Sequence, residues 1–176
     1  MDKLMISLYS LRPATWDDFE FVFQLNKINM WKYVELVRVW SDEVERADMH
    51  RKFAPGRDQI VQIDGKAVGV FKVDYQESEI CLNHIELLPE FQGKGVGTAL
   101  MQKVLTEAES LNMPVTLYVL KINPAKQFYK HLGFQTVEEI ASGKDCNGME
   151  RGVKCKMLAA ANATTVGKAQ LRQGVS

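Results

Sequence analysis

The sequence is short of cysteine, of excess charge and of long apolar runs. Its three cysteines, Cys81, Cys146 and Cys155, are odd in number and widely spaced, so we expect reduced thiols rather than a disulfide framework. Lysine plus arginine and aspartate plus glutamate both total 22, which excludes the strong basic field of a typical nucleic-acid-binding protein. The reduced thiols favour a cytoplasmic protein, and the charge balance favours one that does not bind nucleic acid.

Two further absences concern membranes and metals. No apolar run approaches the roughly 20 residues that a membrane-spanning helix needs. The run LMISLYSL near the start is broken by serines and lacks the small-residue pattern of a signal-peptide cleavage site, so we expect a strand there and no membrane contact. Cys81 and His84 form one C-x-x-H pair without a second pair at zinc-site spacing, and we expect no metal.

The composition is that of a globular protein, with 46% of the 176 residues hydrophobic and 25% charged. This length suits one domain with a sizeable core. Because neither an internal repeat nor a linker divides the chain, we expect a single domain over residues 1–158. Residues 159–176 are mostly small and polar and have no periodicity, so we expect a disordered tail there.

The first part of the chain predicts a strand followed by helices. Thr15 and Asp18 are spaced as a helix N-cap and its partner, ahead of apolar residues at helical spacing. The charged and aromatic segment from Trp31 to Phe53 predicts further helix, which Pro55-Gly56 ends.

The rest of the chain alternates β-rich runs with helical patterns. Asp64-Gly65 between QIVQID and KAVGVFKVDY is a strong hairpin signal, and ICLNHIELL follows as another strand. An apolar helical stripe begins near Gly95. Asn123 and Pro124 begin a shorter helix, which Gly133 ends. Further strands are predicted at VTLYVL, FQTVEEI and GVKCKML.

Three glycines, Gly93, Gly95 and Gly97, alternate with other residues where the long helix is about to begin. The G-x-G-x-x-G pattern of dinucleotide-binding proteins fails in both registers, and the P-loop pattern lacks its first glycine. A helix start offers unpaired N–H groups and a positive dipole end, and glycines let a phosphate approach them closely. With the charge of Lys94 beside them, these residues predict an anion cradle rather than a plain turn before a packed helix.

Two segments carry a family resemblance. Gln92-Gly93-Lys94-Gly95-Val96-Gly97 resembles the Q/R-x-x-G-x-G/A signature of the GNAT superfamily of N-acetyltransferases, and it follows a strand that ends in an apolar-apolar-Pro-Glu step. Asn123 to Phe134 resembles the second signature of that family, in which an Asn and an Ala precede a Tyr on a short helix that ends in Gly-Phe. The order of strands and helices from about Leu4 to Leu158 also agrees.

The resemblance implies an α/β (α+β) fold with a mixed, mostly antiparallel central sheet, splayed in the middle and with helices on both faces. It implies that acetyl-CoA, the acetyl donor, lies in the gap between the two central strands. The glycine segment would hold the pyrophosphate, the preceding strand end would pair with the pantetheine arm, and the short helix would line the other side. The implied coenzyme-binding residues are Leu87, Leu88, Gln92, Gly93, Lys94, Gly95, Val96, Gly97, Thr98, Asn123, Ala125 and Phe128.

Acetyl transfer to an amine needs a base for the amine and an acid for the leaving thiolate. Tyr129 matches the family's tyrosine and is the expected acid, because a phenol with a pKa of about 10 is protonated at neutral pH. Glu86, near the end of its strand, is the candidate base. His84 shares its strand face by alternation and is a second candidate, and a chain of waters is a third. Some relatives carry a glutamate on the fifth strand as a further candidate base, but this chain has Tyr118 at about that place, which removes that option.

These features together predict an N-acetyltransferase that moves an acetyl group from acetyl-CoA to a primary amine by direct attack in a ternary complex. The acceptor is a small molecule or a protein amine that the sequence does not identify. A non-catalytic acyl-CoA-binding sensor and a structural helper subunit are the alternatives. The oligomeric state also stays open, although homodimers are common among relatives.

The helices before the first hairpin are the expected acceptor side. They carry three tryptophans and a cluster of carboxylates, and acidic plus aromatic groups would suit a cationic amine. Tryptophans usually lie in cores, however, and charge runs usually form solvated faces. The residues concerned are Trp16, Trp31, Trp40, Asp42, Glu43 and Glu45.

Overall fold

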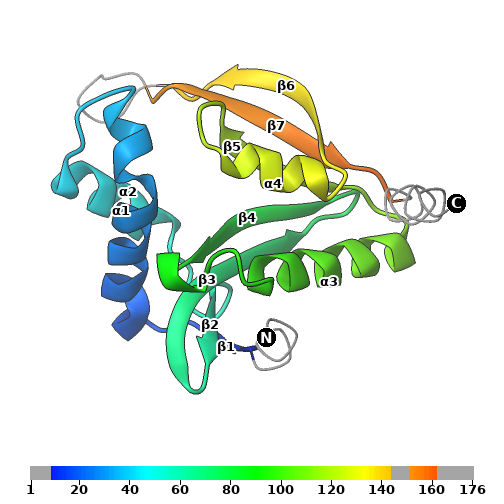
Figure 1. The fold of residues 1–176 in the computed structure, drawn as a ribbon, viewed down its shortest axis with the longest axis horizontal. Helices are drawn as coiled ribbons and strands as arrows, with labels where there is room; N and C mark the ends of the chain where they lie inside the picture. The colour runs from blue at the N-terminus through cyan, green and yellow to red at the C-terminus, as the bar shows by residue number, and fades with distance from the viewer. Residues whose placement is uncertain (1–8, 144–150, 162–176) are drawn as a thin grey trace, which may run out of the picture. The chain divides into compact units, whose positions relative to one another are not determined.

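The computed structural model describes residues 9–143 and 151–161 (Figure 1). Its strands are β1 Tyr9–Pro13, β2 Gln59–Ile63, β3 Lys66–Tyr75, β4 Ile80–Leu87, β5 Val115–Leu120, β6 Gln135–Ala141 and β7 Val153–Ala159. Its α-helices are α1 Phe19–Glu35, α2 Asp42–Lys52, α3 Val96–Leu111 and α4 Ala125–His131, with short 3₁₀ helices η1 Trp16–Asp18 and η2 Pro89–Phe91. The start of the first predicted strand, Cys146 and most of the predicted tail lie outside the described residues.

Seven strands within the described residues form one sheet in the order β1-β2-β3-β4-β5-β7-β6. The pairs β1–β2, β2–β3 and β5–β7 are antiparallel, whereas β4 and β5 are parallel, with Ile80 opposite Val115. The prediction of a mixed and mostly antiparallel sheet is therefore confirmed. The splay expected in the middle of the sheet stays a prediction.

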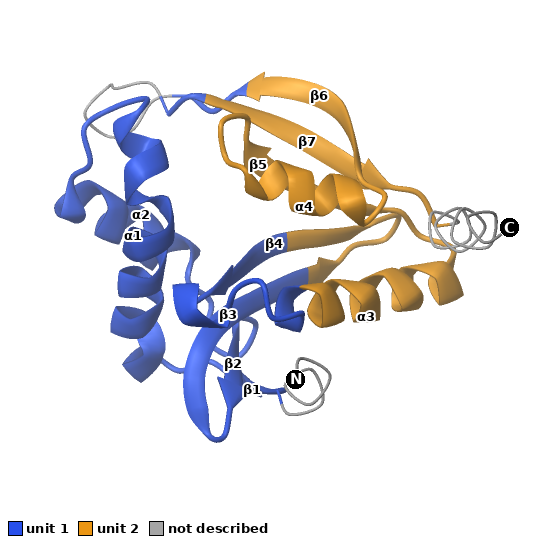
Figure 2. Cartoon of the chain, in the orientation of Figure 1, with its two compact units in different colours: residues 1–73, 83–97, 141–152 blue, residues 74–82, 98–140, 153–176 orange. Residues whose placement is uncertain are grey.

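The described chain divides into two compact units whose segments alternate along the sequence (Figure 2). Unit 1 takes its residues from 1–73, 83–97 and 141–152, and unit 2 from 74–82, 98–140 and 153–176. Strands β3 and β4 and helix α3 each contribute residues to both units. The single domain over residues 1–158 and the tail that follows stay predictions.

The core of unit 1 forms where α1 packs on β2 and β3. Val22 and Leu25 of α1 lie one helical turn apart, and both side chains are fully buried. They belong to one cluster with Ile60 of β2 and Val70 of β3, which lie opposite each other in the sheet. The buried members of this cluster are Ala14, Val22, Leu25, Phe53, Ile60 and Val70.

In unit 2, α4 contacts β5 (Figure 2), and both α3 and β5 contribute buried apolar side chains. The predicted stripe is confirmed, since Leu100, Met101, Val104, Leu105 and Ala108 are all buried. In β5, Val115, Leu117 and Val119 are buried, whereas Tyr118 is 48% exposed.

Several local signals act as predicted. The turn residues Asp64 and Gly65 have φ of 50° and 74°, as the tight hairpin requires. The carboxylate of Asp18 accepts a hydrogen bond from the main-chain N–H of Thr15 at 2.8 Å. Asn123 Oδ1 accepts from the N–H of Ala125 at 2.9 Å and so caps α4 at its start.

The continuous helix predicted from Trp31 to Phe53 is wrong. Helix α1 runs through Trp31 and ends at Glu35, and α2 begins at Asp42. The Glu35 carboxylate accepts from the N–H of Trp40 at 2.5 Å, and Ser41 Oγ accepts from the N–H of Val44 at 3.4 Å as the N-cap of α2. Side chains that bind nearby main-chain groups compete with helical hydrogen bonds, so they break the helix here.

Candidate active site

A tight turn links β4 to α3 through the predicted anion cradle. Gly93 and Gly95 have φ of 68° and 86°, in the left-handed region that favours glycine, and α3 begins at Val96 directly after them. The glycine requirement at these two positions thus has a conformational cause. The Val96 side chain is buried, whereas Lys94 is exposed and holds Nζ 5.7 Å from the ring centroid of Phe91. The turn therefore leads directly into the positive end of a 16-residue helix.

Gln92 anchors the start of this turn. Its side-chain Nε2 donates to the carbonyl oxygen of Leu87 and to Oδ1 of Asn29, both at 2.9 Å. Its main-chain N–H donates to the carbonyl oxygen of Pro89 at 3.2 Å. The glutamine of the first signature therefore has a visible structural task, which is to tie the glycine turn to the end of β4 and to α1.

The end of β4 is well paired inside unit 1. The N–H of Leu88 donates to the carbonyl oxygen of Val68, and the carbonyl oxygen of Leu88 accepts from the N–H of Phe91, both at 2.8 Å. Leu87 is buried, and its carbonyl oxygen also accepts from Asn29 Nδ2 at 3.0 Å. The main-chain positions expected to meet a pantetheine arm are thus held in a fixed arrangement.

Glu86 and His84 lie on one face of β4, as strand alternation predicts. The Nε2 atom of His84 is 2.8 Å from Oε1 of Glu86, and the two side chains are 23% and 12% exposed. Two asparagines of α1 complete the surroundings of the carboxylate. Asn26 Nδ2 donates to Oε1 at 2.7 Å, and Asn29 Nδ2 makes a longer contact of 3.4 Å with Oε2.

This arrangement moves both pKa values in favour of an ion pair. Burial acts to raise the pKa of Glu86, but the charge and hydrogen bond of His84 and the two asparagine amides outweigh it and lower that pKa below its ordinary value. Burial likewise opposes protonation of His84, yet the charge and hydrogen bond of Glu86 raise the pKa of the imidazole. Asp58 adds to this rise, whereas Lys72 opposes it.

The pair has consequences for the candidate base. A carboxylate with a lowered pKa is a weak base by itself, and an imidazole with a raised pKa holds a proton more readily at neutral pH. Glu86 and His84 therefore act chemically as one unit, which binds or releases a proton through the imidazole while the carboxylate stabilises the charged form.

The remaining predicted site residues belong to unit 2. Tyr129 is buried, and its ring centroid lies 5.3 Å from that of Phe128 and 5.9 Å from that of Phe134. Asn123 and Ala125 form the capped start of α4, as described above. Thr98 lies in the first turn of α3. The joint site that the sequence predicts from the residues of both units stays a prediction.

Sequence reasoning missed Asn26 and Asn29, because it considered only the apolar face of the first helix. A signal was present: asparagine is a poor helix former, and two asparagines three positions apart share a face of the helix. The structure places both amides against Glu86.

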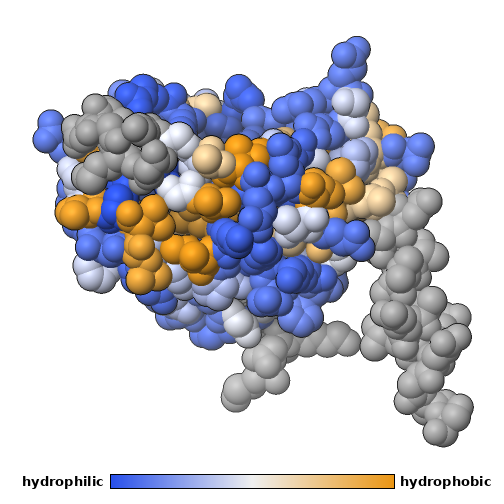
Figure 3. Space-filling view, turned by 90° about the horizontal axis from the view of Figure 1, so that it is seen from above, coloured by the Kyte–Doolittle hydropathy of each residue, from blue (hydrophilic) through white to orange (hydrophobic). Residues whose placement is uncertain are grey.

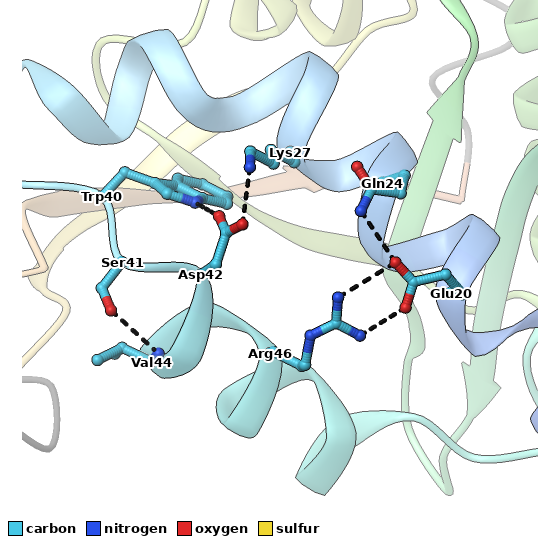
Figure 4. A network of polar contacts seen from close by, with 8 residues as sticks. All are labelled: Glu20, Gln24, Lys27, Trp40, Ser41, Asp42, Val44 and Arg46. Carbon is cyan, nitrogen blue, oxygen red and sulfur yellow. Dashed lines mark hydrogen bonds and ion pairs between the residues drawn. The ribbon is translucent and has the colours of Figure 1, made fainter.

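The acidic cluster expected on the acceptor side is largely engaged within unit 1. Asp42 accepts from Lys27 Nζ at 2.8 Å and from the indole N–H of Trp40 at 2.6 Å (Figure 4). Glu45 pairs with Arg38 at 2.5 Å. These carboxylates join α2 to its neighbours, which weakens the hypothesis that they receive a cationic amine.

The tryptophans expected in cores are partly at the surface. Trp16 is 52% exposed and stacks on His50 with ring centroids 4.8 Å apart. Trp31 is 50% exposed and lines a shallow groove of about 310 Å³ with Gln24, Lys27 and Ile28. Apolar side chains gather in groups between polar ones on the face seen in Figure 3.

Metal and membrane features can be assessed for residues 9–143 and 151–161. They contain no cluster of three or more His, Cys, Asp and Glu side chains that could hold a metal ion. In the same residues, none of the helices combines the length and the apolar character needed to cross a bilayer.

Comparisons with known proteins place the chain beside acetyltransferases. A family model described as an acetyltransferase (GNAT) domain matches residues 29–150. A curated acetyltransferase of Pectobacterium atrosepticum is 28% identical over 138 residues, which cover 76% of this chain and 93% of that protein.

Solved structures show the same fold. A PaiA N-acetyltransferase from Thermoplasma acidophilum, in complex with coenzyme A, has a TM-score of 0.59 at 16% identity and covers 86% of this chain and 98% of its own. Naa50 of Arabidopsis thaliana, in complex with the bisubstrate analogue CoA-Ac-MVNAL, has a TM-score of 0.57 at 18% identity with the same two coverages, 86% and 98%.

Proposed function

The chain belongs to the GNAT acetyltransferase family, and on that basis we propose that it is an N-acetyltransferase that moves an acetyl group from acetyl-CoA to a primary amine. The single observation that carries the proposal beyond the family is the Gln92-anchored glycine turn at the start of α3. A turn of this kind presents main-chain N–H groups and the positive end of a helix dipole to an anion. The diphosphate of acetyl-CoA is such an anion.

In this proposal, the main-chain N–H groups of residues 93–98 hold the diphosphate, since the N–H of Gln92 is already bonded to the carbonyl oxygen of Pro89. Lys94 adds mobile positive charge. Leu87 and Leu88 border the pantetheine arm at the end of β4. From unit 2, Asn123, Ala125 and Phe128 contribute contacts to the coenzyme. The solved relative in complex with coenzyme A supports acetyl-CoA as the donor.

The Glu86–His84 pair, in its form with a neutral imidazole, accepts the proton that the amine must lose before or during its attack. Its 2.8 Å contact and the raised pKa of His84, which the charge of Glu86 causes against the cost of burial, support this role. The nitrogen of the amine forms a bond to the carbonyl carbon of the acetyl group while the bond from that carbon to sulfur breaks. The sulfur leaves with the electron pair of the broken bond, and Tyr129 donates its phenolic proton to it, which gives the free thiol of coenzyme A.

The transfer is direct, in a ternary complex, because the described cysteines are poorly suited to form an acetyl-enzyme. Cys81 and Cys155 are both buried. The Thr116 hydroxyl lies 3.5 Å from Cys81 Sγ, and a buried thiol of this kind is a weak nucleophile.

The acceptor class is a primary amine on a small molecule or on a peptide. The relative in complex with CoA-Ac-MVNAL supports an acyl acceptor of peptide type as one member of that class. The engagement of Asp42 and Glu45 in ion pairs gives no support to a requirement for a strongly cationic acceptor.

The test is the full-length chain with labelled acetyl-CoA and a panel that includes polyamines, amino acids, aminoglycosides and short peptides. Release of free thiol and mass spectrometry of the products report turnover, and a reaction without amine measures hydrolysis. Acetylated product above that background supports the proposal. Tight acetyl-CoA binding without any product across the panel instead supports a sensor, and absence of acetyl-CoA binding contradicts both.

A further inference from the structure

The Asn29 side chain of α1 contacts both Gln92, at the start of the glycine turn, and Glu86 of the Glu86–His84 pair. Asn29 Nδ2 donates to the carbonyl oxygen of Leu87 at 3.0 Å and lies 3.4 Å from Oε2 of Glu86. Asn29 Oδ1 accepts from Gln92 Nε2 at 2.9 Å. The amide thus uses its nitrogen toward β4 and its oxygen toward the start of the glycine turn, and each partner fits the orientation assigned to it.

We propose that Asn29 is a positioning residue that couples the coenzyme-binding turn to the Glu86–His84 pair. The proposal rests on the function proposed above. Asn29 touches neither reacting atoms nor coenzyme in this scheme. It acts through Gln92 on one side and through Glu86 on the other.

The geometry favours a coupling element over a simple anchor between helix and sheet. Gln92 Nε2 and Asn29 Nδ2 donate to the same carbonyl oxygen of Leu87, and the two amides also bind each other. The three groups form a closed ring, so displacement of the turn at Gln92 is transmitted to Asn29 and from there to the carboxylate of Glu86. In a shared network of this kind, the free-energy change caused by two substitutions together differs from the sum of the changes that each causes alone.

The hydrophobic packing of α1 does not need this residue. Val22 and Leu25 are fully buried and provide the apolar contact of α1 with the sheet, whereas Asn29 is only partly buried. The Asn29 amide contributes directional hydrogen bonds rather than buried apolar area. Asparagine is also unfavourable within a helix, which agrees with a role beyond the helix itself.

The charged surroundings determine what an added negative charge would do. Glu86 faces His84 on its own strand and the two asparagines of α1. The charge on His84 also interacts electrostatically with Asp58, ahead of β2, and with Lys72 of β3. An aspartate at position 29 would keep an acceptor for Gln92 but would place a second carboxylate beside Glu86. Repulsion between like charges and attraction to the imidazolium would both favour the protonated form of the pair.

The test uses Asn29→Ala, Asn29→Asp, Gln92→Ala and the double variant of Asn29→Ala with Gln92→Ala. The control is Gln24→Ala, which removes an amide from the outer face of α1 where it binds Glu20 at 2.9 Å. Calorimetry with acetyl-CoA gives the affinity, and thermal unfolding gives the stability. The pKa of His84 is measured by NMR titration of its imidazole, with His84→Gln to assign the signal among the three histidines of the chain.

We expect Asn29→Ala to weaken acetyl-CoA binding about five-fold, the effect of one lost hydrogen bond of ordinary strength. In the double variant the loss should be no greater than in Gln92→Ala alone. Asn29→Asp should raise the pKa of His84 by about one unit, as a new carboxylate at this range does. Gln24→Ala should change neither quantity.

Two failures are distinguishable. If the wild-type chain binds acetyl-CoA but the Asn29 variants change only the unfolding temperature, Asn29 is a structural anchor and the positioning role is overturned. Additive losses in the double variant overturn the coupling in the same way. A wild-type chain that does not bind acetyl-CoA overturns the proposed function, and the positioning role with it.

Discussion

The Nε2 atom of His84 lies 2.8 Å from Oε1 of Glu86, two residues along β4, and the two side chains form a mostly buried ion pair. Its contribution to stability depends on pH in a defined way. Because the pKa of Glu86 is lowered, the stability that this carboxylate contributes is fully present above pH 4.5 and is lost as the pH falls through the lowered pKa. Because the pKa of His84 is raised, the stability that the imidazole contributes is fully present below pH 6.5 and is lost as the pH rises through the raised pKa.

The first prediction concerns this window. Replacing His84 with Gln should destabilise the protein most between pH 4.5 and 6.5, where both parts are complete. Breaking a buried pair by removing one partner costs about 3–5 kcal/mol, so the difference in unfolding temperature from the wild type should be several degrees. Thermal unfolding from pH 4 to 9 measures it, with His131→Gln as a control for an exposed histidine. A difference that does not change with pH would contradict the ion pair.

The second prediction concerns the glycine turn. Replacing Gly95 with Val should abolish acetyl-CoA binding, because a branched side chain at φ 86° strains the turn and obstructs approach to its N–H groups. Gly56→Val is the matched control, since Gly56 has a φ of 84° and an added Cβ would meet no described atom within 4 Å. Both variants carry similar backbone strain, of about 1–3 kcal/mol. Calorimetry should find coenzyme binding lost only at Gly95, and equal affinities would contradict the cradle.

Local signals account for most of the fold that the sequence predicts. The Asp64-Gly65 hairpin, the apolar stripe of α3 and the Asn123 cap each depend on residues close together in the chain, and each is confirmed. The continuous helix predicted from Trp31 to Phe53 is wrong, because the chain leaves the helical conformation between Glu35 and Asp42. This break depends on which main-chain groups the side chains of Glu35 and Ser41 bind, and the helical pattern does not reveal that choice.

The candidate site could be predicted only in part for a related reason. Alternation along one strand places His84 and Glu86 on the same face, so the sequence contains their proximity. The contact of Asn29 with Gln92 joins residues 63 positions apart and exists only after α1 has packed against the sheet. Tertiary contacts of this kind have no local pattern, which is why the sequence predicts Gln92 as a site residue but not the partner that holds it.

The third prediction concerns the segment that follows residues 144–150. Buried Asp48 of α2 binds Arg51 and also Arg151, which lies beyond that segment. Replacing Asp48 with Asn should lower stability by about 3–5 kcal/mol, because Arg151 then loses its charged partner while it is mostly buried. Chemical denaturation measures the loss, with Asp17→Asn as a control for an exposed aspartate. A loss no larger than that of the control would show that the two arginines contribute only as surface charges.

The fourth prediction separates the two functions of Tyr129, as a buried ring and as a proton donor. Replacing Tyr129 with Phe keeps the ring contacts with Phe128 and Phe134, so the fold and the affinity for acetyl-CoA should change little. Turnover should fall about 100-fold or more, the usual loss when a general acid is removed. Tyr118→Phe removes a phenol that is 48% exposed on β5 and should leave turnover unchanged. Steady-state rates with an accepted amine decide the matter: if Tyr129→Phe retains the wild-type rate, the leaving thiolate takes its proton from another group, and Tyr129 serves unit 2 as packing alone.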